Sequence, residues 1–222
     1  MTSKQEDYVP ALAYDGRTRF YDPLIAMALR ENTFKRALIE QAQIQNGQRV
    51  LDLACGTATL TLMIKNACPD AEVTGVDGDP NILSIARGKI EKAQVDIVLD
   101  EAMSFELPYE DRSFDRVLSS LFFHHLTSEN KTRTAAELYR ILKPGGSLHV
   151  ADWGKPQNLA MAGAILSVRF LDGFDITADN VKGRLPSFFE QAAFKDVGLH
   201  REFATVMGAI ALYSALKPDG FA

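Results

Sequence analysis

Short apolar runs alternate with amphipathic segments along the chain from residue 49 onward. A short apolar run bounded by turn residues is typical of a strand covered on both faces, whereas apolar residues at helical spacing predict a helix with one buried face. The pattern predicts strands at residues 49–55, 72–77, 96–100, 147–153, 197–206 and 209–217, and a further strand that starts at residue 113 and runs into a loop. It predicts helices at residues 59–66, 82–92, 129–142, 159–171 and 185–194.

The connections between these elements predict how the strands pair. Strands separated by a helix favour a parallel sheet, because the helix carries the chain back across one face. Only Met207 and Gly208 separate the last two strands, and so short a connection requires an antiparallel hairpin. The sequence therefore predicts an α/β fold with three layers, in which a Rossmann-like, seven-stranded, mostly parallel sheet ends in a C-terminal antiparallel hairpin.

The domain organisation follows from where this regularity starts and where it is interrupted. Residues 1–48 mix turn signals with helical periodicity and predict a helical N-terminal lead-in or cap. Residues 49–222 are expected to form one domain, and the break at residues 156–184 predicts a lid-like insertion. A chain of 222 residues with 46% hydrophobic content is long enough for one domain with a sizeable core.

Residues 50–60 have the features of a buried strand that leads into a ligand-binding turn. Asp52 is an acid inside the apolar run, so its carboxylate requires a partner, such as turn amides or a cationic ligand group at the end of the strand. Gly56 allows a sharp turn and a close approach to a ligand, and the next helix directs its amino end at that ligand. These features predict a nucleotide-type site.

A second acid stands at the end of the next strand. Asp77 precedes Gly78, and a carboxylate in this place can accept hydrogen bonds from both hydroxyls of a ribose. Capping of the following helix suits Asp79 better, because Pro80 then occupies the first helical position. We therefore interpret Asp77 as a ribose ligand.

The glycine positions of the first turn distinguish two kinds of nucleotide site. A dinucleotide fingerprint requires three glycines, where this chain has Ala54, Gly56 and Thr59. The pattern of one acid and three glycines found in class I S-adenosylmethionine-dependent methyltransferases falls on Asp52 and on residues 54, 56 and 58, and here the chain resembles that family. Ala54 and Ala58 replace two of its glycines, which we interpret as a tolerated variant because Gly56 is kept.

The resemblance covers roughly residues 49–218, and further motifs occur in the same order as in the family. Phe-Phe-His-His-Leu at 122–126, Leu-Lys-Pro-Gly-Gly at 142–146 and Gly-Ala-Ile-Ala-Leu-Tyr at 208–213 are most similar to the ubiquinone and menaquinone biosynthesis methyltransferases. The resemblance implies S-adenosylmethionine as cofactor, S-adenosylhomocysteine as product and a small, apolar or aromatic methyl acceptor. Together with the positions argued above, the expected cofactor contacts are Tyr21, Asp52, Ala54, Gly56, Thr57, Asp77, Gly78, Ala102, Met103, Ser120 and Leu121.

Some of these contacts have alternatives. Relatives commonly carry an acid four residues before the Leu-Pro at 107–108, where this chain has Met103. Adenine is then contacted by Asp100 or Glu101, or by the main chain of Ala102 and Met103 with the methionine side chain against the ring. Tyr21 either contacts the methionine end of the cofactor or is an ordinary core aromatic.

The residues after the fourth strand predict the acceptor side. Phe122 and Phe123 indicate an apolar pocket, and the resemblance implies that His124 and His125 face the acceptor, with His124 preferred. The predicted catalytic residues are these two histidines and Asp152, which ends the fifth strand at the same edge of the sheet. Any of them can act as general base toward a phenol or an activated carbon, although one histidine is expected to be structural. A metal site is not expected, because adjacent imidazoles cannot easily face one ion.

Composition narrows the range of partners. The formal net charge is -5 and no run of basic residues occurs, so nucleic-acid binding is not expected. Residues 1–8 are polar and no apolar stretch approaches membrane-spanning length, which predicts a soluble cytoplasmic protein without membrane insertion. Cys55 and Cys68 are too few for a disulfide framework and are expected to be reduced thiols. We expect a monomer or a homodimer.

Two other functions remain as alternatives. A protein that binds S-adenosylmethionine or its demethylated product without catalysis, as a sensor or a partner subunit, carries the same cofactor motif. A nicotinamide oxidoreductase shares the strand, turn and helix but is disfavoured by Thr59 in place of a glycine.

Overall fold

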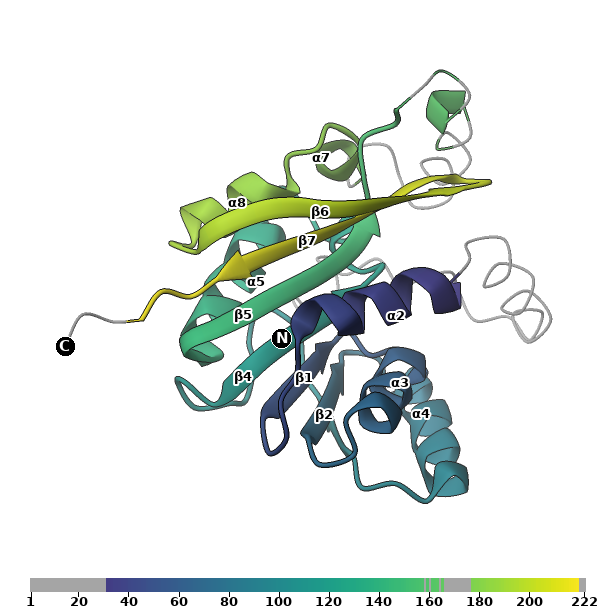
Figure 1. The fold of residues 1–222 in the computed structure, drawn as a ribbon, viewed down its shortest axis with the longest axis vertical. Helices are drawn as coiled ribbons and strands as arrows, with labels where there is room; N and C mark the ends of the chain where they lie inside the picture. Colours follow the sequence, from purple (N-terminus) through teal and green to yellow (C-terminus); the bar gives the residue numbers. More distant parts are fainter. Residues whose placement is uncertain (1–30, 158, 160, 164, 166–176, 220–222) are drawn as a thin grey trace, which may run out of the picture.

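A seven-stranded sheet forms the centre of the protein in the computed structural model, which describes residues 31–157, 159, 161–163, 165 and 177–219 (Figure 1). The strands lie in the order β3-β2-β1-β4-β5-β7-β6. Their bounds are β1 Arg49–Leu53, β2 Glu72–Asp77, β3 Val98–Glu101, β4 Phe114–Ser120, β5 Leu142–Trp153, β6 Lys195–Thr205 and β7 Gly208–Leu216.

Strands β1 to β5 are parallel, and the last two strands add an antiparallel edge. β1 pairs with β2 and β4, β2 pairs with β3, and β4 pairs with β5, all in parallel. β7 runs antiparallel to β5 and β6, and a pair between Thr205 and Gly208 closes the hairpin. The fold class predicted from the sequence is confirmed, with strand bounds that differ by a few residues.

Helices cover both faces of the sheet. α2, α3 and α4 lie on one face, where α2 contacts α3, β4 and β5, and α5 and α8 pack together on the other (Figure 1). This arrangement gives the three predicted layers. The helices are α2 Glu31–Ala42, α3 Thr59–Ala67, α4 Pro80–Ala93, α5 Ser128–Ile141, α7 Ala178–Val181 and α8 Leu185–Gln191, with a short 3-10 turn, η1 Phe123–His125.

Alternate residues of β1 face the two helical layers. On β1, Leu51 and Leu53 belong to the apolar cluster that includes α5 and α8, whereas Val50 belongs to the cluster that includes α2 and α3. All three are fully buried, which explains why the run is continuously apolar. Asp52 follows the same alternation, so its side chain shares the face of Val50.

The start of α4 agrees with its sequence signals. Asp79 is the N-cap, and its carboxylate accepts a hydrogen bond of 2.8 Å from the backbone N–H of Asn81. Pro80 is the first helical residue, where its missing N–H has no cost. Asp79 therefore fills the capping role that was the alternative function for Asp77.

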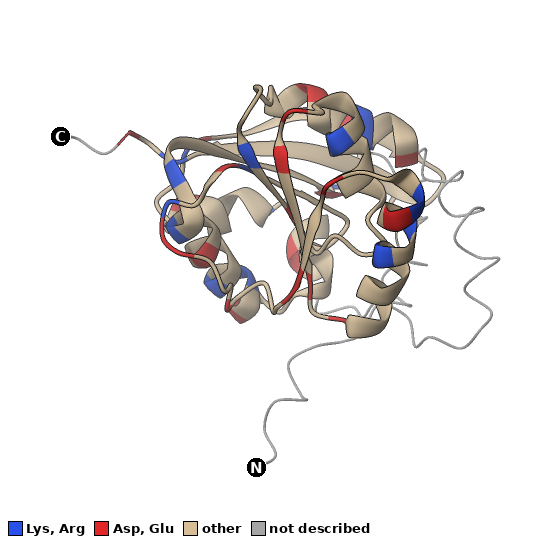
Figure 2. Cartoon of the chain, turned by 90° about the horizontal axis from the view of Figure 1, so that it is seen from below, with Lys and Arg blue, Asp and Glu red and all other residues tan. Residues whose placement is uncertain are grey.

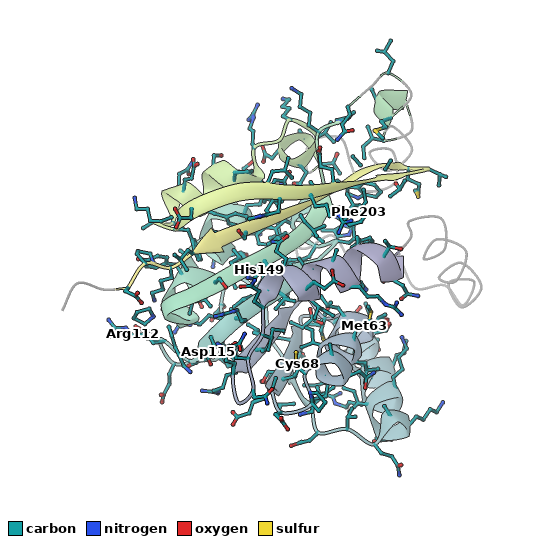
Figure 3. The ribbon with its side chains drawn as sticks, viewed as in Figure 1. Met63, Cys68, Arg112, Asp115, His149 and Phe203 are labelled. Atoms are coloured by element: carbon teal, nitrogen blue, oxygen red, sulfur yellow. The ribbon has the colours of Figure 1, made fainter. Side chains whose placement is uncertain are left out.

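Residues 143–146 form an irregular start of β5. The strand begins at Leu142, and its ladder with β4 shifts register there. Gly145 has a φ of 73°, a left-handed conformation that glycine adopts without strain. The Nζ of Lys143 lies 2.8 Å from a carboxylate oxygen of Asp115 and ties this bulge to the start of β4 (Figure 3). The irregularity therefore lies at the edge opposite the carboxyl ends of the parallel strands.

Two predicted features lie wholly or partly outside the described residues. These are the first part of the lead-in, residues 1–30 with Tyr21, and most of the helix predicted at 159–171. The division into a lead-in at 1–48, a domain at 49–222 and a lid-like insertion at 156–184 stays a prediction.

Lysine and arginine positions, drawn in blue, and aspartate and glutamate positions, drawn in red, both occur over the described part of the chain (Figure 2). In this view the blue segments of the ribbon lie among red and tan ones. In the same part of the chain, none of the helices has the length and apolar character needed to cross a membrane.

Candidate functional site

A cavity of about 250 Å³ opens at the carboxyl ends of β1 to β4. This is the edge at which ligands bind in doubly wound sheets, because the loops there diverge to either face. Most of the predicted site residues line it, and the lining also includes residues of α2 and of the loop after β3. The predicted residues in the lining are Ala54, Gly56, Thr57, Asp77, Gly78, Ala102, Met103, Ser120, Leu121 and His125.

The turn after β1 is built from left-handed residues. Ala54, Gly56 and Ala58 have φ values of 55°, 54° and 61°. The left-handed region costs a residue with a Cβ roughly 1–2 kcal/mol, so the two alanines are strained where glycines would not be. The alanines therefore affect backbone strain as well as space, which the sequence did not indicate. Three alternating left-handed residues turn the chain sharply from β1 into α3.

Asp77 lies on the cavity wall with its carboxylate held by two main-chain amides. Oδ2 accepts from the N–H of Gly56 at 2.9 Å, and Oδ1 accepts from the N–H of Asp79 at 3.0 Å. Burial raises the pKa of Asp77, and these amide hydrogen bonds oppose the rise. A carboxylate has about four lone-pair sites, so each oxygen keeps capacity for one more donor. Two vicinal hydroxyls match this arrangement.

Asp52 lies beside the cavity and is not part of its lining. It is almost completely buried, and its Oδ2 accepts a hydrogen bond of 2.7 Å from the hydroxyl of Thr61 on α3. Burial raises the pKa of Asp52 to about 7, while the Thr61 hydrogen bond and the charge of Lys35 on α2 oppose the rise. A cationic group bound near this carboxylate would favour its ionised form.

The loop after β3 places Ala102 and Met103 on the cavity wall. Neither Asp100 nor Glu101 lines the cavity, and the carboxylate of Asp100 instead accepts a hydrogen bond of 3.0 Å from the hydroxyl of Tyr109. Of the two alternatives for adenine, this geometry agrees with main-chain contact at residues 102–103 beside the methionine side chain.

The 3-10 turn η1 separates the two histidines that follow β4. His125 lines the cavity, whereas His124 is only 3% exposed and does not. The Nδ1 of His124 donates to Oδ1 of Asp152 at 2.7 Å. In so tight a turn successive side chains point in different directions, so only one histidine can face the cavity. Of the two rings, only that of His125 lies in the cavity lining, so the geometry does not favour the preference for His124; which histidine faces the acceptor stays a prediction.

Asp152 carries a buried carboxylate that has several hydrogen-bond partners. Its carboxylate is fully buried and also accepts from the N–H of Trp153 at 2.7 Å and that of Phe122 at 3.2 Å. Burial alone would raise the pKa of Asp152, but the charge and the hydrogen bond of His124 hold it below its ordinary value. Burial and the charge of His124 lower the pKa of His125 to about 3. His125 is thus a neutral imidazole at pH 7.

Several lining residues were not expected from the sequence. Glu31 and Lys35 enter the cavity from α2, where they form an ion pair one helical turn apart. A signal was present, because the pair continues in line with the buried Ile39 and Ala42 along one face of the helix. The other unexpected lining residues are Leu53, Cys55, Thr59, Val76, Ile82, Ser104, Phe105, Phe122 and Leu126. Tyr21 lies outside the described residues.

Acidic, histidine and cysteine side chains do not cluster as metal ligands in the described part of the chain, where no group of three or more could hold an ion. Cys55 on the cavity wall is 7% exposed, and burial raises its thiol pKa far above the ordinary value. Its role is therefore that of a small packing residue.

Residues 50–146 match a family model described as a methyltransferase domain. A curated relative, demethylmenaquinone methyltransferase of Thermus thermophilus, is 38% identical over 123 residues. That match covers 55% of this chain and 55% of the relative, so the chain spans about half the length of the curated relatives it matches. A second one, from Deinococcus radiodurans, is 33% identical over 62% of this chain and 56% of its own.

Solved structures share the fold at low sequence identity. The apo form of the S-adenosylmethionine-dependent methyltransferase SibL has a TM-score of 0.74 and 22% identity, over 98% of this chain and 64% of that one. The solved structure shows the same fold, and the matches to the methyltransferase family model and to the two curated relatives support the resemblance that the sequence predicted.

Proposed function

We propose that this protein is an S-adenosylmethionine-dependent methyltransferase whose acceptor is a small aromatic molecule of the quinone type. The observation that carries the proposal is the cavity in which the left-handed turn after β1, the amide-held Asp77 and the loop after β3 meet. These three parts suit, in order, the amino-acid end, the ribose and the adenine of one S-adenosylmethionine molecule.

The lining residues fit this cofactor. The free lone pairs of Asp77 suit the two ribose hydroxyls, and a side chain at Gly78 would place a Cβ 2.9 Å from the sulfur of Met103. Gly78 therefore lets the main chain approach Met103 closely enough to form one continuous wall. Residues 54–57 line the cavity directly after Asp52, so a cationic group bound against this turn would lie close to that carboxylate.

The acceptor class is inferred from the other end of the cavity. Leu121, Phe122 and Leu126 give an apolar lining after β4, and His125 adds one neutral polar group. An apolar wall with a single imidazole suits an aromatic ring that carries a hydroxyl or a carbonyl. The two curated relatives described above are named for a quinone-type acceptor, demethylmenaquinone, which supports the same class.

Methyl transfer requires positioning more than covalent help from the protein. When bound, S-adenosylmethionine supplies a methyl group that is already electrophilic because it is attached to a sulfonium. We infer that the apolar lining excludes water and aligns the acceptor, while His125 holds one acceptor oxygen by a hydrogen bond. With a pKa of about 3 this imidazole is a weak base, so orientation is its main role. The dyad of His124 and Asp152 fixes η1, and thereby the place of His125.

A methyl-transfer assay tests the proposal. Purified protein is incubated with S-adenosylmethionine and, in turn, with reduced naphthoquinones, simple phenols and small amines, and S-adenosylhomocysteine is quantified. We expect product with hydroxylated aromatic acceptors and none with amines. Tight cofactor binding without transfer to any acceptor would favour the sensor or partner-subunit alternative. The cytoplasmic location, the monomeric or homodimeric state and the absence of nucleic-acid binding stay predictions.

A further inference from the structure

The side-chain amide of Asn180 on α7 has no hydrogen-bond partner. The residue is 0% exposed, and both the nitrogen and the oxygen of its amide are buried and unpaired. Such an amide destabilises the folded state, because it has given up its hydrogen bonds to water and received none in return. Among the described residues, no other buried side chain has a nitrogen or oxygen atom in this condition. Proteins retain uncompensated polar groups of this kind chiefly at functional sites.

The polar groups beside Asn180 are paired. Asp179, the preceding residue, accepts a hydrogen bond of 2.6 Å from the hydroxyl of Ser128 at the start of α5, and its carboxylate lies 3.5 Å from the buried ammonium of Lys131. The main-chain carbonyl of Asp179 accepts from the N–H of Arg184 at 2.8 Å. These contacts tie α7 to the start of α5, so the main chain of Asn180 has a fixed position.

α7 lies beside the acceptor end of the cavity. It contacts η1, which carries His125, and it contacts β5 (Figure 1). Val181, the residue after Asn180, packs against the same apolar cluster as Leu121, and both Leu121 and His125 line the cavity. Asn180 is not part of the lining. Its amide therefore lies behind the wall of the cavity that we assign to the acceptor.

The chemistry of an amide defines what can satisfy it. Its oxygen accepts and its NH₂ group donates, so a hydroxyl or a carbonyl oxygen is a suitable partner. The proposed acceptor is an aromatic ring that carries such groups. Among the described lining residues that follow β4, only His125 has a polar side chain. A second oxygen on the ring would be left unpaired against this apolar wall, which is costly, unless another polar group reaches it.

We propose that Asn180 binds the methyl acceptor, by turning its amide into the cavity and forming a hydrogen bond with an oxygen on the aromatic ring. The turn breaks no hydrogen bond of the protein, because the amide makes none in the free state. Binding then removes the cost of an unpaired buried amide, so a group that destabilises the free protein contributes to acceptor affinity. This inference rests on the proposed function, because it adds a contact in the acceptor site.

Asn180→Leu tests the inference, because leucine has a similar volume and no polar atom. Removal of the unpaired amide should raise the Tm of the free protein by about 2–6 °C. The same change should lower kcat/KM for dihydroxynaphthalene, a reduced naphthoquinone kept under anaerobic conditions, by about 10- to 100-fold. The dissociation constant for S-adenosylhomocysteine, measured by calorimetry, should stay within about twofold of the wild type. Higher stability together with lower turnover distinguishes a lost contact from a damaged fold.

Asn130 provides a matched control. It is an asparagine on α5 with 2% exposure, and its side-chain oxygen lies 3.5 Å from a guanidinium nitrogen of Arg133. Asn130→Leu should lower the Tm, because it removes an amide that has a partner, and this is the opposite sign to Asn180→Leu. Asn180→Ala also removes the unpaired amide, and it should show the same loss of kcat/KM if Asn180→Leu does not fold.

Four results would overturn the inference. If kcat/KM of Asn180→Leu equals that of the wild type, the amide makes no contact with the acceptor. If the Tm and kcat/KM both fall, the amide supports the fold instead. If the affinity for S-adenosylhomocysteine falls as much as kcat/KM, Asn180 acts on the cofactor side. A wild type that transfers a methyl group to no acceptor would contradict the proposed function itself, and this inference with it.

Discussion

The two ends of the cavity are built by different means. At the cofactor end, the part of the cavity that we assign to the cofactor, the main chain makes the site: three left-handed residues set the turn, and backbone amides hold the carboxylate of Asp77. At the acceptor end, the part that we assign to the acceptor, side chains make the site, with Phe122 and His125 in the lining and the dyad of His124 and Asp152 behind them. The first end depends on backbone conformation, and the second depends on rotamers and packing.

This difference determines what a substitution is expected to do. A change at the cofactor end should alter affinity for the nucleoside, because the fixed amides and carboxylates there act directly on the ligand. A change behind the acceptor end should alter stability first, because a buried charge loses its partner. A change in the acceptor lining should alter turnover alone.

The largest effect is expected behind the acceptor end. His124→Ala leaves the fully buried carboxylate of Asp152 without its side-chain partner, which should cost about 3–5 kcal/mol of the free energy of unfolding. Urea unfolding measures this loss. The matched control is His125→Ala, which should cost much less because the ring lines the cavity. Equal losses in the two variants would mean that the two histidines do not differ as their positions require.

The next effect is expected at the cofactor end. Asp77→Ala removes the carboxylate that we assign to the ribose hydroxyls, and the affinity for S-adenosylhomocysteine should fall about 100-fold, or about 3 kcal/mol. Calorimetry provides the dissociation constant. Asp100→Ala removes a carboxylate that bonds Tyr109 outside the lining, so its affinity should match the wild type. If both variants lose affinity alike, Asp77 is not the ribose ligand.

A third test separates binding from turnover. His125→Ala should lower kcat by about 10- to 100-fold through loss of acceptor orientation, with the dissociation constant for S-adenosylhomocysteine unchanged. Between about pH 6 and pH 8 the contribution of His125 to kcat should be independent of pH, because the pKa of His125 is about 3. Full activity of the variant would remove His125 from the acceptor site and leave it as a packing residue.

Acid titration distinguishes buried groups in the two halves of the sheet. His149 lies on β5 (Figure 3). Burial and the charges of Arg116 and His200 lower its pKa to about 3, so between about pH 3 and pH 6.5 the unfolded state binds a proton that the folded state does not. Stability from this group is complete above about pH 6.5 and is lost as the pH falls toward 3. Asp52 has the opposite sign: its raised pKa makes stability fall as the pH rises toward 7.

Unfolding at several pH values checks this contrast. His149→Gln abolishes the difference in proton binding between the folded and the unfolded state at this position. Between pH 7 and pH 5 the variant should therefore lose about 2 kcal/mol less of its free energy of unfolding than the wild type. Asp52→Asn should instead enlarge that acid-side loss, because the variant no longer gains stability from this carboxyl as the pH falls from 7. The same acid-side loss in His149→Gln as in the wild type would show that His149 is protonated in the folded protein.

The smallest effect tests backbone strain at the cofactor end. Ala58 has a φ of 61°, so Ala58→Gly should raise the free energy of unfolding by about 1 kcal/mol. Ala86→Gly in the interior of α4 should instead lower it by about 1 kcal/mol or more, because a helical glycine is unfavourable and a buried methyl is lost. Destabilisation by both changes would mean that the Ala58 methyl contributes more by packing than its backbone strain costs.

Most of the fold and of the cofactor end could be predicted from the sequence for a physical reason. Strand, turn and helix signals are local, and the acid at the end of a parallel strand can only reach the shared edge of the sheet, as Asp77 does. The hairpin followed from the two residues between its strands. Left-handed alanines at 54 and 58 were not foreseen, because alanine gives no sign of positive φ.

The acceptor end was harder to predict, because side-chain direction there depends on tertiary packing. The chain has two adjacent histidines, and only the geometry of η1 assigns His124 to Asp152 and His125 to the cavity. Lys35 was also missed, since a lysine in an amphipathic helix normally indicates a solvated face. Its ion pair with Glu31 becomes informative only when α2 is placed against α3 and β4.

The most direct test of the central claim is a calorimetric titration of the purified chain with S-adenosylhomocysteine and, separately, with NAD⁺. The account predicts saturable binding of S-adenosylhomocysteine at one site, competition by S-adenosylmethionine, and no binding of NAD⁺. A folded protein that binds NAD⁺, or that fails to bind S-adenosylhomocysteine, would contradict it.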